Sequence, residues 1–184
     1  MSLHWANDPV GQLIQCKRAL KPDGLFMACL FGGQTLIELR ASLAGAETRV
    51  SGGLSPRVAP MAEIRDLGGL LQRADLRLPV ADIVTQNVTY RDIFHLARDL
   101  RAMGETNALA ARHRKPPPRA LFDTAQSVYA DQFSDDDGRL KATFELAFLS
   151  GWSAHPDQQQ PLKPGSASHS LADALNQAKS GGND

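Results

Sequence analysis

The sequence predicts an α/β fold. Two observations predict it: a helix-forming stretch that leads into a turn at residues 21–24, and an unbroken apolar run, Leu25–Phe31, directly after that turn. A short apolar run of this kind is typical of a strand buried on both faces in a parallel sheet. A helix, a turn and a buried strand together form half of an α/β unit.

The first helix is expected to begin at Pro9. Proline is tolerated in the first turn of a helix, where its missing N–H costs nothing, and Asn7 or Asp8 can cap the helix. Apolar residues recur at helical spacing further along the chain. This spacing predicts four more helices, over residues 35–46, 61–74, 92–103 and 119–133.

Further strands are expected over residues 80–84 and 87–90. The clearest strand pattern spans residues 140–152, where apolar and polar side chains alternate as in a strand with two unequal faces. We therefore expect one domain over residues 1–152. Residues 153–184 are rich in Pro, Gln, Ser, Gly and Asn, and we expect them to form an extended or disordered tail.

Composition excludes several classes of protein. The 184 residues include 20 basic and 20 acidic side chains, so the broad positive field of a non-specific nucleic-acid binder is absent. The longest apolar run, Leu25–Phe31, is far shorter than the roughly 20 residues that span a bilayer. No secretory leader is visible at the start. Cys16 and Cys29 lie in apolar stretches and are expected to be buried, so we expect a cytoplasmic protein.

The stretch from Phe31 to Thr35 is a candidate ligand site. Gly32, Gly33 and Gln34 follow a strand and open a helix, and ligands of α/β sheets gather at the carboxyl ends of strands. A plain strand-to-helix turn explains the same spacing and is the commoner outcome. Gly-x-Gly occurs nowhere in the chain, so a Rossmann fingerprint and a phosphate loop are both excluded.

Other side chains are weaker candidates. Arg40 and Arg57 can bind a carboxylate or phosphate through two parallel hydrogen bonds, although a surface role is commoner for a lone arginine. Trp5 either stacks on a ligand or packs in the core. The five histidines never pair at helical spacing, so we expect no metal site. No catalytic residue is identified.

Several motifs resemble class I S-adenosylmethionine-dependent methyltransferases. The first are Leu3-His4-Trp5 and the turn Leu20-Lys21-Pro22-Asp23-Gly24. Further motifs are similar to one branch, which contains the methyltransferase-like assembly factor of mitochondrial respiratory complex I and its bacterial relatives. They are Phe31-Gly32-Gly33-Gln34-Thr35-Leu36, Glu38-Leu39-Arg40, Ala46-Glu47-Thr48, Ser55-Pro56-Arg57, Asp66-Leu67-Gly68, Met103-Gly104-Glu105, Gly151-Trp152 and Pro164-Gly165-Ser166-Ala167.

The resemblance implies a Rossmann-like sheet with strand order 3-2-1-4-5-7-6. Strands 5, 7 and 6 correspond to Leu25–Phe31, residues 140–152 and roughly residues 80–90. The chain is thus expected to form the carboxy-terminal half of a methyltransferase sheet with flanking helices. Residues 91–134 are expected to be a helical lid insertion within this partial domain.

The resemblance also implies roles for a few residues. His4 and Trp5 match a segment that borders the cofactor, whereas residues 31–35, Arg40 and Arg57 lie on the substrate side. Many members of the family carry an acidic residue where this chain has Gln34. S-adenosylmethionine is expected in a complete protein, and this chain alone is expected not to bind it tightly, because the family's glycine-rich loop and acidic residue belong to the amino-terminal half.

Three functions remain open on this basis. The first is a cytoplasmic bacterial methyltransferase-family protein that lacks its amino-terminal cofactor-binding half. The second is a protein-arginine hydroxylase, the activity that the resemblance suggests for the assembly factor, and the third is a non-enzymatic assembly or binding module. In the last case the edge Leu25–Phe31 would pair with a partner strand or with a second copy in a homodimer.

Overall fold

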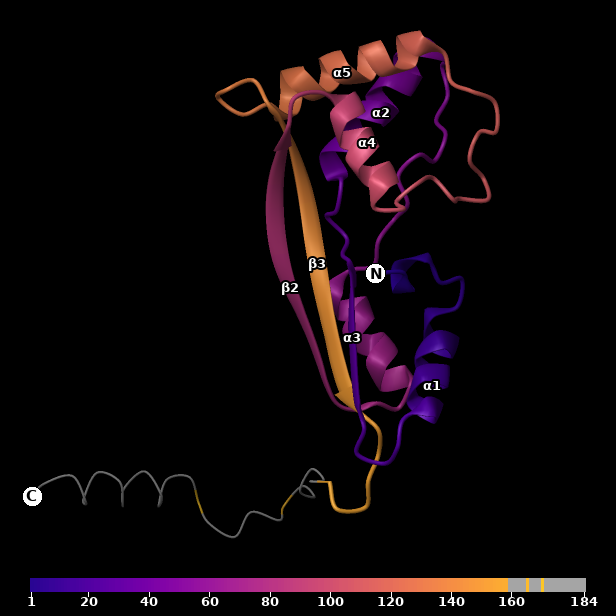
Figure 1. The fold of residues 1–184 in the computed structure, drawn as a ribbon, viewed down its shortest axis with the longest axis vertical. Coiled ribbons are helices and arrows are strands. Elements are labelled where there is room, and N and C mark those ends of the chain that lie inside the picture. Colours follow the sequence, from indigo (N-terminus) through magenta and orange to yellow (C-terminus); the bar gives the residue numbers. More distant parts are fainter. Residues whose placement is uncertain (159–164, 166–169, 171–184) are drawn as a thin grey trace, which may run out of the picture. The chain divides into compact units, whose positions relative to one another are not determined.

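The sheet has three strands, with β3 at its centre. In the computed structural model, which describes residues 1–158, 165 and 170, β1 spans Leu25–Phe31, β2 spans Arg77–Tyr90 and β3 spans Leu140–Trp152. β3 pairs antiparallel with β1 on one side and with β2 on the other (Figure 1). The α/β prediction and the bounds of β1 and β3 are confirmed. The two segments expected at 80–84 and 87–90 are one long strand.

Five α-helices and a short 3₁₀ helix lie around this sheet in the described part of the chain. Their bounds are η1 Leu3–Trp5, α1 Pro9–Ala19, α2 Ile37–Val50, α3 Ile64–Arg73, α4 Ile93–Ala102 and α5 Arg119–Phe133. All five predicted helices are present. Asp8 caps α1, because its side chain accepts a hydrogen bond from the Gly11 N–H.

α2 begins two residues later than predicted, and the reason is its attachment to β3. The Leu36 N–H donates to the Thr143 carbonyl at 2.7 Å, and Leu36 has a left-handed backbone with φ of 57°. The chain is therefore still bonded to the sheet at Leu36 and can turn into a helix only at Ile37.

The two faces of β3 serve two different hydrophobic cores. Leu140, Ala142 and Phe144 pack with α2, α4 and α5, whereas Ala147 and Leu149 pack with α1 and α3. Successive side chains of a strand point to opposite faces, so the even-numbered and odd-numbered residues face opposite ways. The two groups of helices therefore pack against side chains of opposite alternation, and they lie at opposite ends of the long strands (Figure 1).

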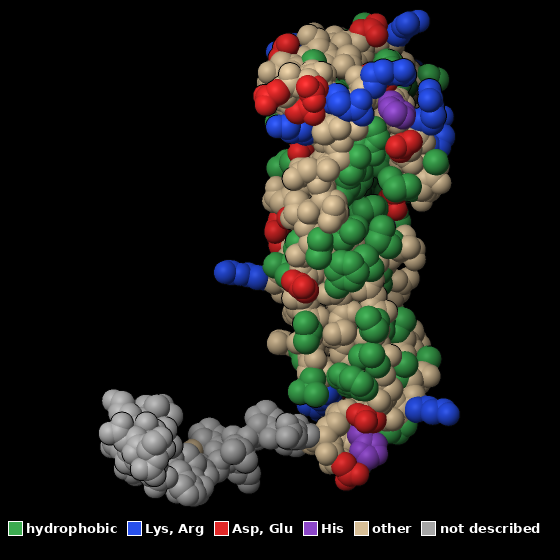
Figure 2. Space-filling model, turned by 60° about the vertical axis from the view of Figure 1, so that its left-hand side comes forward, with side chains coloured by type: hydrophobic (Ala, Val, Ile, Leu, Met, Phe, Trp, Pro, Cys, Tyr) green, Lys and Arg blue, Asp and Glu red, His purple; other side chains and the backbone are tan. Residues whose placement is uncertain are grey.

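One part of the sheet has no helix over it among the described residues. We call it the open sheet face, and it consists of Leu25, Met27, Val80, Val84 and Phe148. Met27 is 73% exposed, so the expectation that β1 is buried on both faces is wrong. Figure 2, which turns the β2 side forward, shows hydrophobic side chains gathered over this part of the molecule.

The expected burial of the two cysteines and the expected lid helices can also be compared with the structure. Cys16 is exposed and Cys29 is half-buried, so the expectation of two buried cysteines is wrong. α4 and α5 supply core residues such as Leu96 and Tyr129, and their role as a lid stays a prediction. Residues 1–154 form one compact unit and residues 155–184 a second, and most of the expected tail lies outside the described residues. No described helix is long and apolar enough to cross a membrane.

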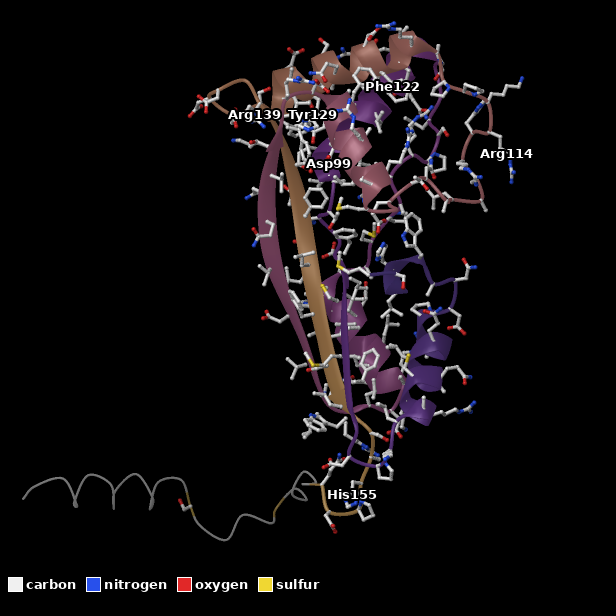
Figure 3. The ribbon with its side chains drawn as sticks, viewed as in Figure 1. Asp99, Arg114, Phe122, Tyr129, Arg139 and His155 are labelled. Carbon is white, nitrogen blue, oxygen red and sulfur yellow. The ribbon has the colours of Figure 1, made fainter. Side chains whose placement is uncertain are left out.

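Tyr129 gives a stability test of the core formed by α2, α4 and α5. Tyr129 lies on α5 beside β3 (Figure 3), is fully buried, and donates a 2.7 Å hydrogen bond from its hydroxyl to the Lys141 carbonyl. Burial, together with the nearby Glu38 carboxylate, raises the pKa of Tyr129 well above its usual value near 10. Tyr129→Phe should lower the free energy of unfolding at pH 7 by about 1–2 kcal/mol, because the hydrogen bond is lost.

The pH dependence has a definite sign. Above pH 10 the unfolded chain releases the phenolic proton while the folded chain retains it, so stability from Tyr129 is present below pH 10 and lost above it. Urea unfolding of both proteins at pH 7 and pH 10.5 should show the gap between wild type and Tyr129→Phe narrowing at the higher pH. A gap that is equal at both pH values would contradict the burial of this hydroxyl.

Candidate functional site

The loop after β1 is fastened to β3. The Gly32 N–H donates to the Glu145 carbonyl at 2.8 Å. The Thr35 hydroxyl donates to the same carbonyl at 3.2 Å and accepts from the Glu145 N–H at 3.1 Å. Thr35 is buried and both hydrogen bonds go to backbone, so its role in this structure is to hold the loop at the carboxyl end of β1.

Two carboxylates press against the glycines of this loop. A Cβ on Gly33 would collide with the Glu63 carboxylate, and a Cβ on Gly32 would stand 3.1 Å from Glu145 Oε2. The Gln34 N–H donates to Glu145 Oε2 at 2.9 Å. Glycine lets the backbone lie against these carboxylate groups, and a Cβ at Gly33 would require the Glu63 side chain to move.

A third carboxylate, Glu105, joins η1 to the segment after α4. Glu105 Oε2 accepts a hydrogen bond from Trp5 Nε1–H at 3.1 Å, and both carboxylate oxygens lie 3.2 Å from His4 Nε2. The His4 side chain is 2% exposed and the Glu105 side chain is 12% exposed. The pair is therefore almost completely shielded from water, where charge-assisted hydrogen bonds are strong.

The end of α4 places Glu105 in this position. The Gly104 N–H donates to the Arg101 carbonyl and the Glu105 N–H donates to the Leu100 carbonyl, at 3.1 Å and 2.8 Å. This is the Schellman arrangement, which requires a left-handed residue after the helix, and Gly104 has φ of +85°. The sequence Met103-Gly104-Glu105 thus ends a helix and turns the next side chain toward His4.

Two aromatic rings pack against His4. The ring centroids of His4 and Trp5 are 5.3 Å apart, and those of His4 and Phe31 are 5.2 Å apart. His4 Nδ1 is buried and has no hydrogen-bond partner within the described part of the chain. An apolar cavity of about 130 Å³, to which Leu30 and Met61 contribute, lies beside His4.

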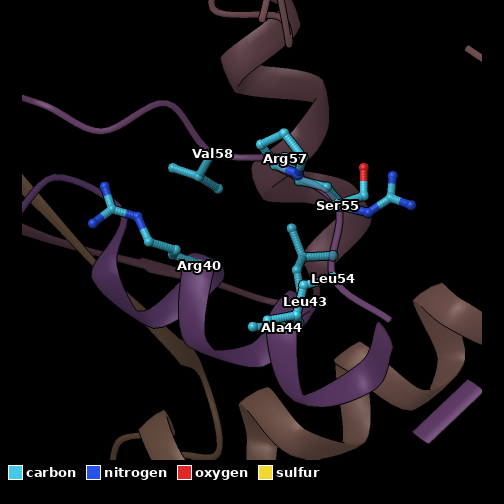
Figure 4. A pocket seen from close by; sticks show the side chains of 8 residues that line it. Arg40, Leu43, Ala44, Leu54, Ser55, Arg57 and Val58 are labelled. Atoms are coloured by element: carbon cyan, nitrogen blue, oxygen red, sulfur yellow. The ribbon is translucent and has the colours of Figure 1, made fainter. Parts of the chain in front are cut away.

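Arg40 and Arg57 line a different pocket, of about 330 Å³, between α2 and the loop at residues 54–58 (Figure 4). Arg57 Nε donates to the buried Glu47 carboxylate at 2.6 Å, and Arg40 Nη2 donates to the Ala59 carbonyl at 3.1 Å. Their guanidinium groups point away from each other, with Leu43 between them (Figure 4). The two arginines do not join the loop after β1 in one site.

The predicted site residues thus divide into two groups. His4, Trp5 and the loop from Phe31 to Thr35 come together at the end of β1, whereas Arg40 and Arg57 lie apart. Sequence reasoning missed the three carboxylates Glu63, Glu105 and Glu145. Only Glu105 left a signal, since Met103-Gly104-Glu105 is one of the motifs that carried the resemblance. Within residues 1–158, no three His, Cys, Asp or Glu side chains are placed to hold a metal ion.

Several named proteins are similar in sequence to this chain over most of its length. The mitochondrial arginine-hydroxylase NDUFAF5 of Danio rerio is 39% identical over 94% of this chain and 54% of its own length. The protein of the same name from Dictyostelium discoideum is 42% identical over 91% of this chain and 38% of its own. A malonyl-[acyl-carrier protein] O-methyltransferase from a Methylovorus species is 34% identical over 89% of this chain and 54% of its own.

The chain resembles class I methyltransferase-like proteins. It resembles the arginine hydroxylases over nearly all of its own length and spans about half the length of most of these relatives. The search of family models gave no match. A solved structure from Bacillus halodurans, described as a methyltransferase, covers 84% of this chain and 67% of its own at 11% identity and a TM-score of 0.48. That structural likeness is too weak to add to the sequence evidence.

The relatives overturn one expectation about this methyltransferase-like chain. The proteins that share 39–42% identity with it are named as mitochondrial and come from eukaryotes, including Homo sapiens and Rattus norvegicus. The expectation of a cytoplasmic bacterial protein, drawn from the absence of a visible leader, from the two cysteines and from the resemblance to bacterial proteins, is therefore wrong. Neither of the first two features distinguishes a bacterial cytoplasm from another reducing compartment.

Proposed function

We propose that this chain forms the substrate-binding part of an enzyme that acts on the arginine side chain of a protein. The observation that carries the proposal is the set of hydrogen-bond acceptors around the loop after β1. Glu63 and Glu145 border Gly33 and Gly32, and Glu105 holds His4 against Phe31. The arginine-hydroxylase relatives, at 39–42% identity, support the same substrate class.

A guanidinium suits these acceptors better than an anion does. A guanidinium carries five N–H donors and no acceptor, and carboxylates match its geometry. An anionic substrate, such as the malonyl group in the name of the methyltransferase relatives, needs a free cation instead. Arg57 is already paired with Glu47, and it lies in the separate pocket with Arg40.

The described residues offer S-adenosylmethionine a partial surface. His4 and Trp5 present aromatic rings, but the Trp5 N–H is already bonded to Glu105. When bound, S-adenosylmethionine supplies a methyl group, whereas hydroxylation takes one oxygen atom from dioxygen and two electrons from a reductant. We expect the remaining contacts to such a cofactor to come from residues outside this chain, and this chain by itself to bind S-adenosylmethionine weakly.

Mass spectrometry of arginine peptides tests the proposed function. A protein of the relatives' length that contains this chain should add one oxygen atom to an arginine side chain. Glu63→Gln and Glu145→Gln should each reduce kcat/KM about 10- to 100-fold, because a charge-assisted hydrogen bond to the substrate is worth about 1.5–3 kcal/mol.

Asp66→Asn is the matched control for these two variants. Asp66 is an exposed carboxylate in the first turn of α3, close in sequence to Glu63. Its loss should leave the rate unchanged. A mass gain of one methylene would identify methyl transfer instead of hydroxylation. Equal rates for all three variants and the wild type would contradict an arginine site at this loop.

The open sheet face supports a second proposal, which is self-association. β1 pairs only with β3 among the described residues, and its free edge adjoins the exposed side chains of Leu25 and Met27. Unpaired edges with apolar side chains are templates for another strand. An antiparallel pair of identical edges satisfies a two-fold axis, so we propose a homodimer through Leu25–Phe31.

Light scattering tests the homodimer at micromolar concentration. The wild-type chain should scatter as a dimer, and Met27→Lys should shift it to a monomer, because a charge would then be buried in the apolar contact. Gln86→Lys is the control, because it adds the same charge on β2 at an exposed polar position outside the patch. A wild-type chain that stays monomeric throughout, or a Met27→Lys variant that stays dimeric, would refute this contact.

A further inference from the structure

The hydrogen bonds of Glu105 place a proton on Nε2 of His4. An ionised carboxylate only accepts hydrogen bonds, and an indole N–H only donates. Glu105 therefore accepts from Trp5 Nε1–H at 3.1 Å, and the His4 Nε2 atom, 3.2 Å from both carboxylate oxygens, must also be a donor. In a neutral imidazole with its proton on Nε2, the other ring nitrogen carries a lone pair.

That lone pair is buried and unused. His4 Nδ1 has no hydrogen-bond partner within the part of the chain that the structure describes, and the His4 side chain is 2% exposed. A buried polar atom without a partner costs free energy, so such atoms are rare and point to a group that the described residues do not supply. The missing partner must be a donor, because Nδ1 can only accept in this tautomer.

The surroundings leave the ring little freedom to turn. Trp5 and Phe31 flank it, with ring centroids at 5.3 Å and 5.2 Å. Glu105 itself is held by the helix end, where its N–H bonds the Leu100 carbonyl and Gly104 takes the left-handed turn. Packing against the two rings and the hydrogen bond to Glu105 together fix the direction in which the Nδ1 lone pair points.

We propose that Glu105 is a positioning residue: it holds His4 with the proton on Nε2, so that Nδ1 accepts a hydrogen bond from a guanidinium N–H of the substrate. A guanidinium fits because all five of its polar hydrogens are donors. This role rests on the proposed function for the identity of the donor. The tautomer itself does not depend on that function.

Nitrogen-15 spectroscopy of the histidine rings in this chain tests the tautomer directly. The wild type should show His4 with its proton on Nε2, and the His4→Gln variant assigns the signal. Glu105→Gln should move the proton to Nδ1, since the glutamine carbonyl must serve the Trp5 donor and its amide then donates to Nε2. Glu63→Gln, the control, should leave His4 unchanged.

Two results would overturn the positioning role. One is a wild-type ring with a proton on Nδ1, whether or not Nε2 is protonated as well, and this result needs no variant to fold. The other is a Glu105→Gln variant that has the same circular dichroism spectrum as the wild type and unchanged His4 nitrogen signals.

The arginine assay separates this proposal from the function on which it rests. In the protein of the relatives' length, Glu105→Gln should lower hydroxylated product about tenfold or more, whereas Asp66→Asn should not. If the Glu105→Gln variant forms as much hydroxylated product as the wild type, the positioning role is refuted and the proposed function still stands. Absence of product from every variant, with the predicted tautomers observed, would refute the function and leave the tautomer assignment standing.

Discussion

The pairing of β3 with both of its neighbours supports the rest of the described fold. β3 bonds β1 and β2 along its length, and it contributes side chains from residues 140–144 to one core and from residues 147–149 to the other. The same strand holds the loop after β1, because the Glu145 backbone bonds Gly32 and Thr35 and the Thr143 carbonyl bonds Leu36. The candidate site is therefore built on a central strand and not on a free loop.

The site that results is an acceptor surface. Glu63 and Glu145 border the loop after β1 and Glu105 holds His4 beside Phe31, whereas Arg57 is paired with Glu47 and lies with Arg40 in another pocket. Burial strengthens the contact between His4 and Glu105, since water hardly screens it, whereas Glu63 is exposed and Glu145 is half-buried. A cationic group with many donors is the ligand that such a surface favours, and this favours an arginine side chain over an acidic acyl group.

Local sequence patterns predicted the helices and strands well, but they could not predict contacts between residues that are far apart in the sequence. The unbroken run at Leu25–Phe31 and the alternation over Leu140–Trp152 gave both strands at their observed bounds. The burial of β1 was predicted wrongly, because a strand's own residues do not say whether a helix covers each face. Glu105 was missed for a similar reason: it lies 101 residues from His4, and only the fold brings them together.

A titration of this chain with two amino-acid derivatives measures the central claim most directly. N-acetyl-arginine methylamide carries a guanidinium, whereas N-acetyl-citrulline methylamide has nearly the same shape and no charge. Binding is followed through the backbone amide signals of Gly33, Gln34 and Glu105. The account predicts saturable shifts of these signals with the arginine compound and none with the citrulline compound. Equal shifts with both compounds, or shifts confined to the pocket of Arg40 and Arg57, would contradict it.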